Sequence, residues 1–276
     1  MLLVLVIALP RTGNAQQIPP NELNLQLEYA RALYISQQYY DCITELKRLS
    51  FFDKECKLGF DTNYLIGKCY KAGAKISDAV KYFSLAQKFS PDDSILFNLK
   101  IEVVRCNILR RTNEQAFYLL GQLESDPRFK GRIKDIHYWK AWNYIFWDKW
   151  DSASVEFGRV SDNHPLKILA MEIEKEKYSV SFAKVISYIL PGFGQFYTGN
   201  YISGIMSLGW TGLFCYLALD AYAADRIFDG FVMTGLFFRF HRGNAQNAEK
   251  FAVIKNKEIS NQALNYLQNK FEGLKP

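Results

Sequence analysis

The sequence predicts an all-α protein in which a solenoid of helical hairpins precedes a membrane hairpin and an amphipathic tail helix. Three observations support this fold class. A pattern of small and bulky residues recurs every 37 residues over 22–165, a run of 19 residues without charge covers 201–219, and Pro191 with nearby glycines interrupts the chain before that run. Because a helix needs about 20 apolar residues to cross a bilayer, the uncharged run is expected to be a membrane helix.

Composition bounds the class of protein. A mean hydropathy of −0.14 is too low for a polytopic transporter, whereas 49% hydrophobic residues suit a soluble region joined to a small membrane part. The net charge of +6 is spread along the chain without a dense Lys or Arg block, which argues against nucleic acid as a partner.

Residues 1–15 are expected to form a secretory signal peptide. Residues 2–9 are an apolar core, and Gly13, Asn14 and Ala15 place small residues at the cleavage positions, although the usual basic start is missing. Eight apolar residues are too few to cross about 30 Å of hydrocarbon, so we expect export rather than an uncleaved anchor.

The 37-residue period assigns two helices to each repeat. A small residue of the first helix, a small residue of the second helix and a bulky residue four positions after it all recur, with Val104 as the departure from the small residues. Pro91 and Pro165 close the second and fourth units. In chain order the three series are Ala30, Gly67, Val104 and Ala141; Cys42, Ala79, Ala116 and Ala153; and Leu46, Phe83, Leu120 and Phe157.

Residues 66–91, IGKCYKAGAKISDAVKYFSLAQKFSP, resemble a tetratricopeptide repeat. The resemblance implies four stacked helical hairpins over 22–165, each covering the apolar face that its neighbour leaves open. The period of 37 exceeds the usual 34 of that family, so each helix or connection is expected to be slightly longer. The residues at the family's spacings are Gly67, Tyr70, Ala79, Phe83, Ala86 and Pro91.

Polar residues that recur at the same period are expected to start the first helices. Asn24, Asp61, Asn98 and Asp135 stand where Asn and Asp side chains would accept hydrogen bonds from free helical N–H groups. Residues 166–180 are amphipathic and are expected to cap the solenoid and connect it to the next segment.

In tetratricopeptide arrays the first helices line a concave groove, which identifies candidate partner-binding residues. One inward position carries three cations and a tryptophan, and a neighbouring position begins with a tyrosine and a lysine. Aligned cations favour an acidic segment or a C-terminal carboxylate of a protein partner, with aromatic side chains as apolar anchors. The alternative is a solvated basic face. The candidates are Arg31, Tyr34, Lys68, Lys71, Arg105 and Trp142.

Residues 137–150, HYWKAWNYIFWDKW, concentrate four tryptophans in one predicted hairpin. Packing between helices is the preferred interpretation, since aromatic side chains dominate such contacts. The alternative is that this hairpin docks at the lipid headgroups, where Trp and Tyr concentrate.

The uncharged run 201–219 would be about 28 Å long as a helix, enough to cross the hydrocarbon. Ser203, Ser207, Thr211 and Cys215 stand four residues apart and are expected to form a face for close helix packing. A buried helix of a soluble protein is the alternative interpretation.

The membrane hairpin region is assigned to 181–243. A second, shorter apolar run covers 230–238, and the broken apolar segment 183–197 adds a third, so two or three passes are expected. The amphipathic tail at 244–276 is expected to fold back on the hairpin or lie on the membrane surface.

Residues 191–204, PGFGQFYTGNYISG, resemble the P-G-x-G-Q-x-Y-x-G signature of small bacterial two-helix membrane hairpins, and 240–251, FHRGNAQNAEKF, resemble the segment that follows it. The resemblance covers about a quarter of the chain, marks a family rather than an activity and implies a bacterial membrane location. The proline and glycines would make a hinge whose backbone the glutamine and tyrosine bond. The motif residues are Pro191, Gly192, Gly194, Gln195, Tyr197, Gly199 and Gly204.

The two signals for topology disagree. Cations flank the hairpin and its loop is acidic, which would place the repeats in the cytoplasm by the positive-inside rule. The expected signal peptide places them in the periplasm, and we give it precedence.

The leading functional hypothesis is a non-enzymatic, membrane-anchored scaffold of a bacterial cell envelope that binds a protein partner and membrane lipids. The alternative is a channel or transport component built from oligomerised hairpins. His137, His164 and His241 are scattered, so neither a metal nor another cofactor is expected, and no enzyme constellation is recognised. The cysteines are expected to be buried thiols: Cys42, Cys56, Cys69, Cys106 and Cys215.

Overall fold

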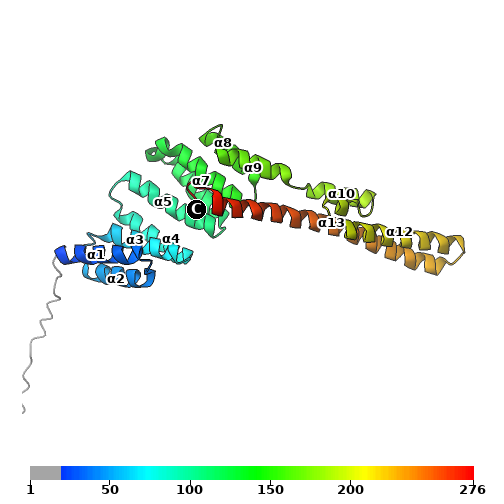
Figure 1. The fold of residues 1–276 in the computed structure, drawn as a ribbon, viewed down its shortest axis with the longest axis horizontal. Coiled ribbons are helices and arrows are strands. Elements are labelled where there is room, and N and C mark those ends of the chain that lie inside the picture. The colour runs from blue at the N-terminus through cyan, green and yellow to red at the C-terminus, as the bar shows by residue number, and fades with distance from the viewer. Residues whose placement is uncertain (1–19) are drawn as a thin grey trace, which may run out of the picture. The chain divides into compact units, whose positions relative to one another are not determined.

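The computed structural model describes residues 20–276, which are α-helical apart from short connections and two 3-10 turns (Figure 1). The all-α prediction is therefore confirmed, while the expected signal peptide at 1–15 lies outside the described residues. The chain divides into two compact units, one ending at Trp147 and the other covering 148–275. The division falls inside the fourth predicted repeat rather than at Pro165.

The first unit is a series of helical hairpins in which each helix packs against the next. Tyr70 stacks on Tyr82 within the second hairpin and Phe97 packs on Phe129 within the third. Its α-helices are α1 (Pro20–Ile35), α2 (Tyr39–Phe52), α3 (Gly59–Ala72), α4 (Ile76–Ala86), α5 (Asp93–Leu109), α6 (Asn113–Ser125) and α7 (Ile133–Phe146).

The positions that recur in the sequence form the core, which confirms a repeat-like arrangement of helical hairpins. The second-helix positions, from Cys42 and Leu46 to Ala153 and Phe157, are all completely buried. Gly67 shows why a small residue is required in the first helix, because a Cβ there would lie 2.7 Å from the Phe83 ring.

The turn between the two helices of a hairpin also recurs, although its residue types do not. Gln37, Ala74, Arg111 and Asp148 all adopt left-handed backbone, with φ between 57° and 61°. These positions are spaced by the repeat period, and each lies just beyond the end of a first helix, where left-handed residues close helices. The first three close the turn by donating their N–H three residues back, as Ala74 does to the Lys71 carbonyl at 3.1 Å.

Replacing Ala74 by Gly is expected to raise the free energy of unfolding by about 0.5–1 kcal/mol, because left-handed backbone is strained for alanine and not for glycine. Chemical denaturation of the full chain measures this change. Ala72→Gly, two residues earlier at the end of α3 and equally exposed, should instead destabilise by a similar amount. A loss of stability in Ala74→Gly would contradict the role of this turn.

The expected capping role of the periodic polar residues is wrong. Asp61 and Asp135 lie in the first turns of α3 and α7, whose N-caps are Leu58 and Arg132, and Asn24 and Asn98 lie further inside α1 and α5. Three of them instead contact basic side chains: Arg31 Nη2 lies 2.7 Å from Asp61 Oδ1, and Arg132 contacts both Asn98 and Asp135. A polar residue that recurs once per repeat can either cap a helix or contact a side chain of the neighbouring repeat. The period is the same for both roles, so it cannot distinguish them.

Most of the four tryptophans serve the core. Trp139, Trp142 and Trp150 are at most 5% exposed, whereas Trp147 packs on Phe117 but stays 38% exposed. Burial of the first three agrees with helix packing as the preferred interpretation.

Three of the five cysteines are buried as expected, whereas Cys56 and Cys215 are exposed. Burial raises the pKa of the Cys106 thiol to about 11. The thiols of Cys42 and Cys69 lie in contact, with 3.3 Å between their sulfur atoms.

The second unit contains six helices within its described residues, and its longest helix runs alongside the others (Figure 1). These helices are α8 (Trp150–Val160), α9 (Pro165–Glu176), α10 (Val180–Ile189), α11 (Phe193–Tyr197), α12 (Tyr201–Ala223) and α13 (Ile227–Lys270).

The tail predicted at 244–276 does not begin at a break. It continues the second helix of the hairpin, so α13 is 44 residues long, or about 66 Å at 1.5 Å per residue. The predicted apolar side of the tail is largely confirmed, since Ala248, Ala252, Ala263 and Leu267 are buried.

A polar network joins the start of this unit to α13. Asp148 accepts hydrogen bonds from Trp150 Nε1 at 3.0 Å and Ser260 Oγ at 2.5 Å, and pairs with Lys177 Nζ at 2.8 Å. Partial burial alone would raise the pKa of Asp148, but the hydrogen bonds and the charge of Lys177 hold it below its usual value. The carboxylate is therefore kept ionised where α8, α9 and α13 meet.

Candidate functional site

Three of the four groove residues predicted in the first two repeats meet in one pocket. Arg31, Tyr34 and Lys68 line a cavity of about 370 Å³ together with Phe60 and Tyr64. The Lys68 ammonium lies 4.7 Å from the centre of the Tyr34 ring and 5.7 Å from that of Tyr64, which places it in cation–π contact.

Most cations of the predicted groove form ion pairs with acidic residues that were not among the predicted groove residues. Arg31 pairs with Glu28 at 2.8 Å as well as with Asp61, and Glu102 pairs with Lys71 at 3.0 Å and contacts Arg105. Lys68 differs from the other cations of the predicted groove. Its contacts within residues 20–276 are with the aromatic rings of Tyr34 and Tyr64 instead of with carboxylates.

The last groove candidate, Trp142, lies in the core, where it is 2% exposed. The structure therefore brings together Arg31, Tyr34 and Lys68, pairs Lys71 with Arg105 through Glu102, and leaves Trp142 unable to act as a surface anchor.

The break predicted at Pro191 is present. α10 ends at Ile189, and Gly192 adopts left-handed backbone with φ of 92° before α11 begins. A Cβ on Gly192 would lie 2.3 Å from the Gly204 carbonyl oxygen, so the turn requires glycine for space as well as for conformation.

Close packing on α11 depends on a second glycine. A Cβ on Gly194 would lie 2.1 Å from the Ala183 carbonyl oxygen and 2.7 Å from the Ala248 Cβ. Only a glycine backbone can approach α10 and α13 this closely. Gly204 makes room for the Phe196 ring in the same way, with 2.4 Å between a built Cβ and Cε1.

Buried side chains satisfy the broken backbone. The amide group of Gln195, which is completely buried, donates to Asn244 Oδ1 at 2.5 Å and to Ser207 Oγ at 3.3 Å. Asn244 Oδ1 also accepts from the Gly192 N–H at 3.2 Å, and its amide donates to the Ser187 carbonyl at 3.0 Å. Ser187 Oγ accepts from the Gly194 N–H at 2.9 Å.

Tyr197, at the end of α11, contacts the chain at the start of α10. Its hydroxyl accepts a hydrogen bond from the Ser179 N–H at 3.1 Å, and its ring packs edge-on against Tyr178 and Phe182. Asn256 binds both the N–H and the carbonyl of Tyr178, at 2.8 and 2.9 Å. Gly199, another member of the motif, has a φ of 76° at the turn before α12.

The predicted packing face of α12 is only partly correct. Thr211 is buried, and Ser203 and Ser207 are half-buried, with Ser207 accepting a hydrogen bond from Gln195, but Cys215 is exposed. A straight helix repeats every 3.6 residues, so a four-residue spacing drifts around its surface. The residues that are buried are Gly204, Thr211, Ala218 and Ala221.

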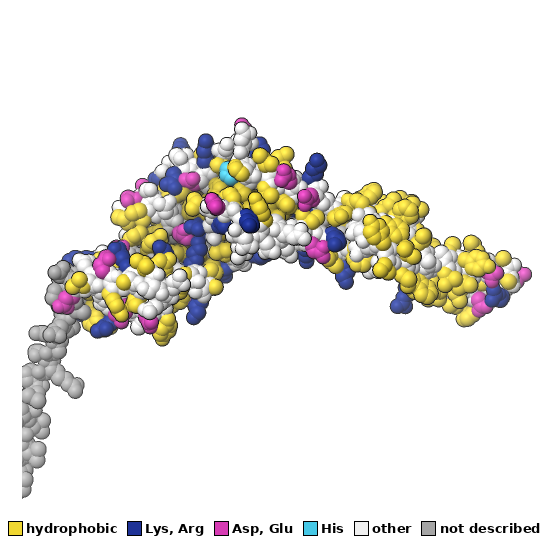
Figure 2. All heavy atoms as spheres, viewed as in Figure 1, with side chains coloured by type: hydrophobic (Ala, Val, Ile, Leu, Met, Phe, Trp, Pro, Cys, Tyr) yellow, Lys and Arg dark blue, Asp and Glu magenta, His cyan; other side chains and the backbone are white. Residues whose placement is uncertain are grey.

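A large apolar surface covers the outside of this part of the chain, which we call the apolar belt (Figure 2). Within residues 20–276, α12 is the helix whose length and composition suit a membrane crossing, and 17% of its apolar window is buried. The apolar start of α13 is too short and too charged to meet the same criteria, so the structure supports one membrane-crossing helix rather than a hairpin that crosses twice. Exposed belt residues include Phe182, Val185 and Ile189 on α10; Ile202, Ile205, Leu208, Leu213 and Leu219 on α12; and Phe228, Phe231 and Phe238 on α13.

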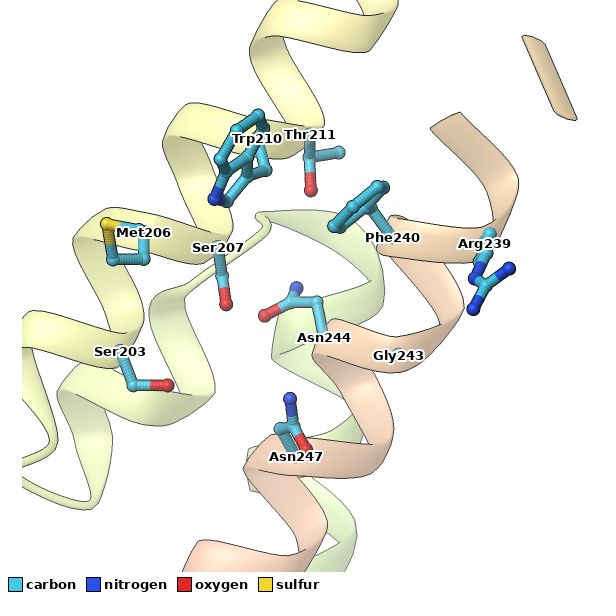
Figure 3. Close-up of a pocket in the computed structure, with 10 residues that line it drawn as sticks. All are labelled: Ser203, Met206, Ser207, Trp210, Thr211, Arg239, Phe240, Gly243, Asn244 and Asn247. Carbon is cyan, nitrogen blue, oxygen red and sulfur yellow. The ribbon is translucent and has the colours of Figure 1, made fainter. Parts of the chain in front are cut away.

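A cleft of about 380 Å³ with a mixed polar and apolar lining, the hairpin cleft, lies between α12 and α13 (Figure 3). The rings of Trp210 and Phe240 stack beside it, with centroids 5.8 Å apart. The residues that line it are Ser203, Met206, Ser207, Trp210, Thr211, Arg239, Phe240, Gly243, Asn244 and Asn247.

Sequence reasoning missed Ser187, Asn244 and Asn256 as individual residues. Asn244 lies in the segment 240–251 that was recognised as a second half of the motif, and that signal could have identified Asn244 as the partner of Gln195. Asn256 carries no comparable signal, because its contact with Tyr178 joins elements that are distant in the chain. Ser187 bonds the nearby Gly194 but lies before the motif at 191–204.

Comparison of the chain with protein-family models, with curated proteins and with solved structures gives no match. The resemblances to tetratricopeptide repeats and to two-helix membrane hairpins therefore rest on the residues themselves.

Proposed function

We propose that this chain is a non-enzymatic, membrane-anchored scaffold of a bacterial cell envelope, in which tetratricopeptide-like repeats bind a protein partner. The proposal rests on the apolar belt, which surrounds the helix break at Pro191. The backbone N–H groups of that break are hydrogen-bonded by side chains of the protein itself. Exposed apolar side chains favour contact with lipid, and inside a bilayer every broken backbone group needs a partner from the protein. Asn244 and Ser187 supply those partners, and Gln195 holds the Asn244 side chain in place.

The helices α10 and α11 suit a re-entrant segment, which enters a membrane, turns and leaves on the same side. α10 and α11 are short, and Tyr197 at the end of α11 bonds Ser179 at the start of α10. α12 then has 23 residues, or about 34 Å, which is enough to cross the hydrocarbon. The signal peptide expected at 1–15 places the repeats in the periplasm.

The groove supports the partner-binding part of the proposal. The pocket around Tyr34, Tyr64 and Lys68 combines aromatic surface with a cation that no acidic group neutralises among its described contacts. An acidic segment or a C-terminal carboxylate would place a negative group at Lys68 and an apolar side chain against the rings. A channel through the hairpin receives less support, because Gln195 and Asn244 bond each other rather than face a path.

Exchanging Arg31 and Lys68 together for Gln is expected to lower recovery of the partner at least tenfold, because the loss of the charge-assisted contact at Lys68 alone costs about 1.5–3 kcal/mol. Cross-linking of the full chain in native membranes followed by quantitative mass spectrometry measures the recovery. Lys47→Gln with Arg48→Gln, on the exposed face of α2, is the matched control and should leave recovery unchanged. The same set of partners at equal yield in both double variants would refute the groove as the binding site.

A further inference from the structure

We propose that the hairpin cleft binds the phosphate group of an anionic membrane lipid. The proposal rests on the membrane anchoring proposed above and names a ligand for that anchor. Four features of the cleft support it: an unsatisfied buried hydroxyl, a row of hydroxyl groups, an unpaired arginine at its edge and an aromatic wall.

The first feature is Thr211. It is 3% exposed, its Oγ1 has no hydrogen-bond partner among the described residues, and it points into the cleft (Figure 3). A buried hydroxyl without a partner is costly, and most such groups in native proteins are bonded. The cleft therefore presents a group that a polar ligand would satisfy.

The hydroxyls of Ser203 and Ser207 lie along the same side of α12 (Figure 3). Ser207 Oγ already accepts a hydrogen bond from Gln195 Nε2, so its own proton is directed elsewhere. Asn247 faces them from α13. Hydroxyl and amide donors that converge without any carboxylate in the lining are suited to the oxygens of a phosphate.

Arg239 supplies the charge. It lines the cleft and makes no ion pair with any residue in 20–276, and its guanidinium points away from α12 at the edge (Figure 3). An arginine beside an apolar belt is expensive unless it meets an anion, and guanidinium binds phosphate through two parallel hydrogen bonds. Its position at the edge favours a headgroup that enters from the bilayer.

The wall formed by Trp210 and Phe240 suits the rest of a lipid. Exposed Ile205 and Leu208 on α12 continue from the cleft into the apolar belt. Acyl chains could lie along this surface while the phosphate occupies the polar end. A free phosphate ion would gain nothing from these apolar groups.

The test uses the full chain in vesicles of phosphatidylcholine with a minor share of phosphatidylglycerol, followed by native mass spectrometry of the extracted protein. We expect phosphatidylglycerol to be enriched over its share of the vesicle. Arg239→Gln should lower bound phosphatidylglycerol about tenfold, and Thr211→Val, which keeps the shape of the side chain, should lower it severalfold. Arg242→Gln, an exposed arginine on the same helix outside the cleft, should have no effect.

Several results would overturn the proposal: no enrichment, equal retention by Arg239→Gln, or equal loss in Arg242→Gln. Displacement of the lipid by inorganic phosphate at equal concentration would assign the cleft to free phosphate instead. Sedimentation of the same vesicles keeps the two proposals apart. A chain that stays with the vesicles without selecting phosphatidylglycerol refutes the lipid site alone, whereas a chain that leaves them refutes the anchoring.

A separate observation supports a second proposal: we infer that Cys42 and Cys69 form a disulfide when the chain is exposed to an oxidising compartment. Cys42 lies on α2 and Cys69 on α3, and both are at most 1% exposed. Their sulfur atoms are 3.3 Å apart, and Cys42 Sγ also donates to the Ala30 carbonyl at 3.1 Å. A pair of thiols in direct contact needs only a small movement to bond.

The oxidant would be a low-molecular-weight disulfide or a thiol–disulfide oxidoreductase. With oxidised glutathione, the Cys42 thiolate attacks one sulfur and releases one glutathione thiolate. The Cys69 thiolate then attacks Cys42 Sγ and releases the second glutathione, and the two protein protons pass to the released thiolates. The hydrogen bond from Cys69 lowers the pKa of Cys42 and raises that of Cys69, so Cys42 attacks first and Cys69 loses its proton in the second step.

Refolding the full chain with oxidised glutathione, followed by alkylation and peptide mapping, tests this inference. We expect a Cys42–Cys69 linked peptide and a higher melting temperature than in reduced glutathione, because a closed loop restricts the unfolded chain. Cys42→Ala should abolish both effects, whereas Cys106→Ala should abolish neither. Mixed disulfides confined to the exposed Cys56 and Cys215 would overturn the inference.

Discussion

Replacing Gly194 by Ala is expected to lower the free energy of unfolding of the 148–275 unit by about 3 kcal/mol, the upper end of the cost of overpacking. The added Cβ would lie 2.1 Å from the Ala183 carbonyl oxygen and 2.3 Å from Ser187 Oγ. The first of these atoms is backbone and cannot rotate away, so α11 must move off α10. That movement breaks the hydrogen bond from the Gly194 N–H to Ser187.

Denaturation of the full chain in mixed micelles, followed by far-ultraviolet circular dichroism, measures this loss. Gly212→Ala is the matched control, because nothing lies within 4 Å of a Cβ at that position of α12. In a helix this exchange should leave stability unchanged or raise it by up to about 1 kcal/mol. Equal stability of the two variants would mean that the close approach around the break is not required.

Phe83→Ala is expected to destabilise the repeat unit by about 3–5 kcal/mol, the usual cost of removing a fully buried aromatic ring. Phe83 is completely buried at a position that recurs in every repeat, and its ring lies against Gly67 of the preceding helix. The truncation opens a cavity beside Gly67, which has no side chain to fill it.

Thermal and urea unfolding of the full chain measure the effect. Phe51→Ala, at a phenylalanine that is 74% exposed at the end of α2, serves as the control and should change stability by less than about 0.5 kcal/mol. A small effect of Phe83→Ala would show that the recurring bulky residues do not form the core.

The repeat region was the most predictable part of the fold. Burial at Ala79 and Phe83 and their equivalents follows from a hydrophobic period, which sequence records directly. The left-handed turns at Gln37, Ala74 and Arg111 escaped notice because the backbone recurs while the residue type changes. Periodic residues such as Asp61 suggested caps, but a carboxylate can equally pair with Arg31 of the preceding repeat.

The candidate sites were predictable in position and not in detail. The motif at 191–204 located the break, and the glycines were correctly expected to permit it. Its bonding to Asn244 depends on how α13 packs against α11, which local sequence does not encode. In the groove, Glu102 was overlooked because it lies outside the inward positions of the register, although it pairs with Lys71 of the preceding repeat.

The central claim, that α12 lies in a membrane while the repeats lie in water, can be tested on the unaltered chain through its own cysteines. Cys56 is exposed beside the repeats, Cys215 is exposed on α12, and the other three thiols are buried. A water-soluble maleimide reacts with the hydrated thiolate, so a thiol that faces lipid stays unmodified.

Opened native membranes, in which both sides are accessible, should be treated with this reagent and the modified peptides quantified. We expect Cys56 to be labelled and Cys215 to be protected until the membrane is dissolved and the chain is denatured. Labelling of Cys215 at the rate of Cys56 in intact membranes would contradict the membrane location of α12.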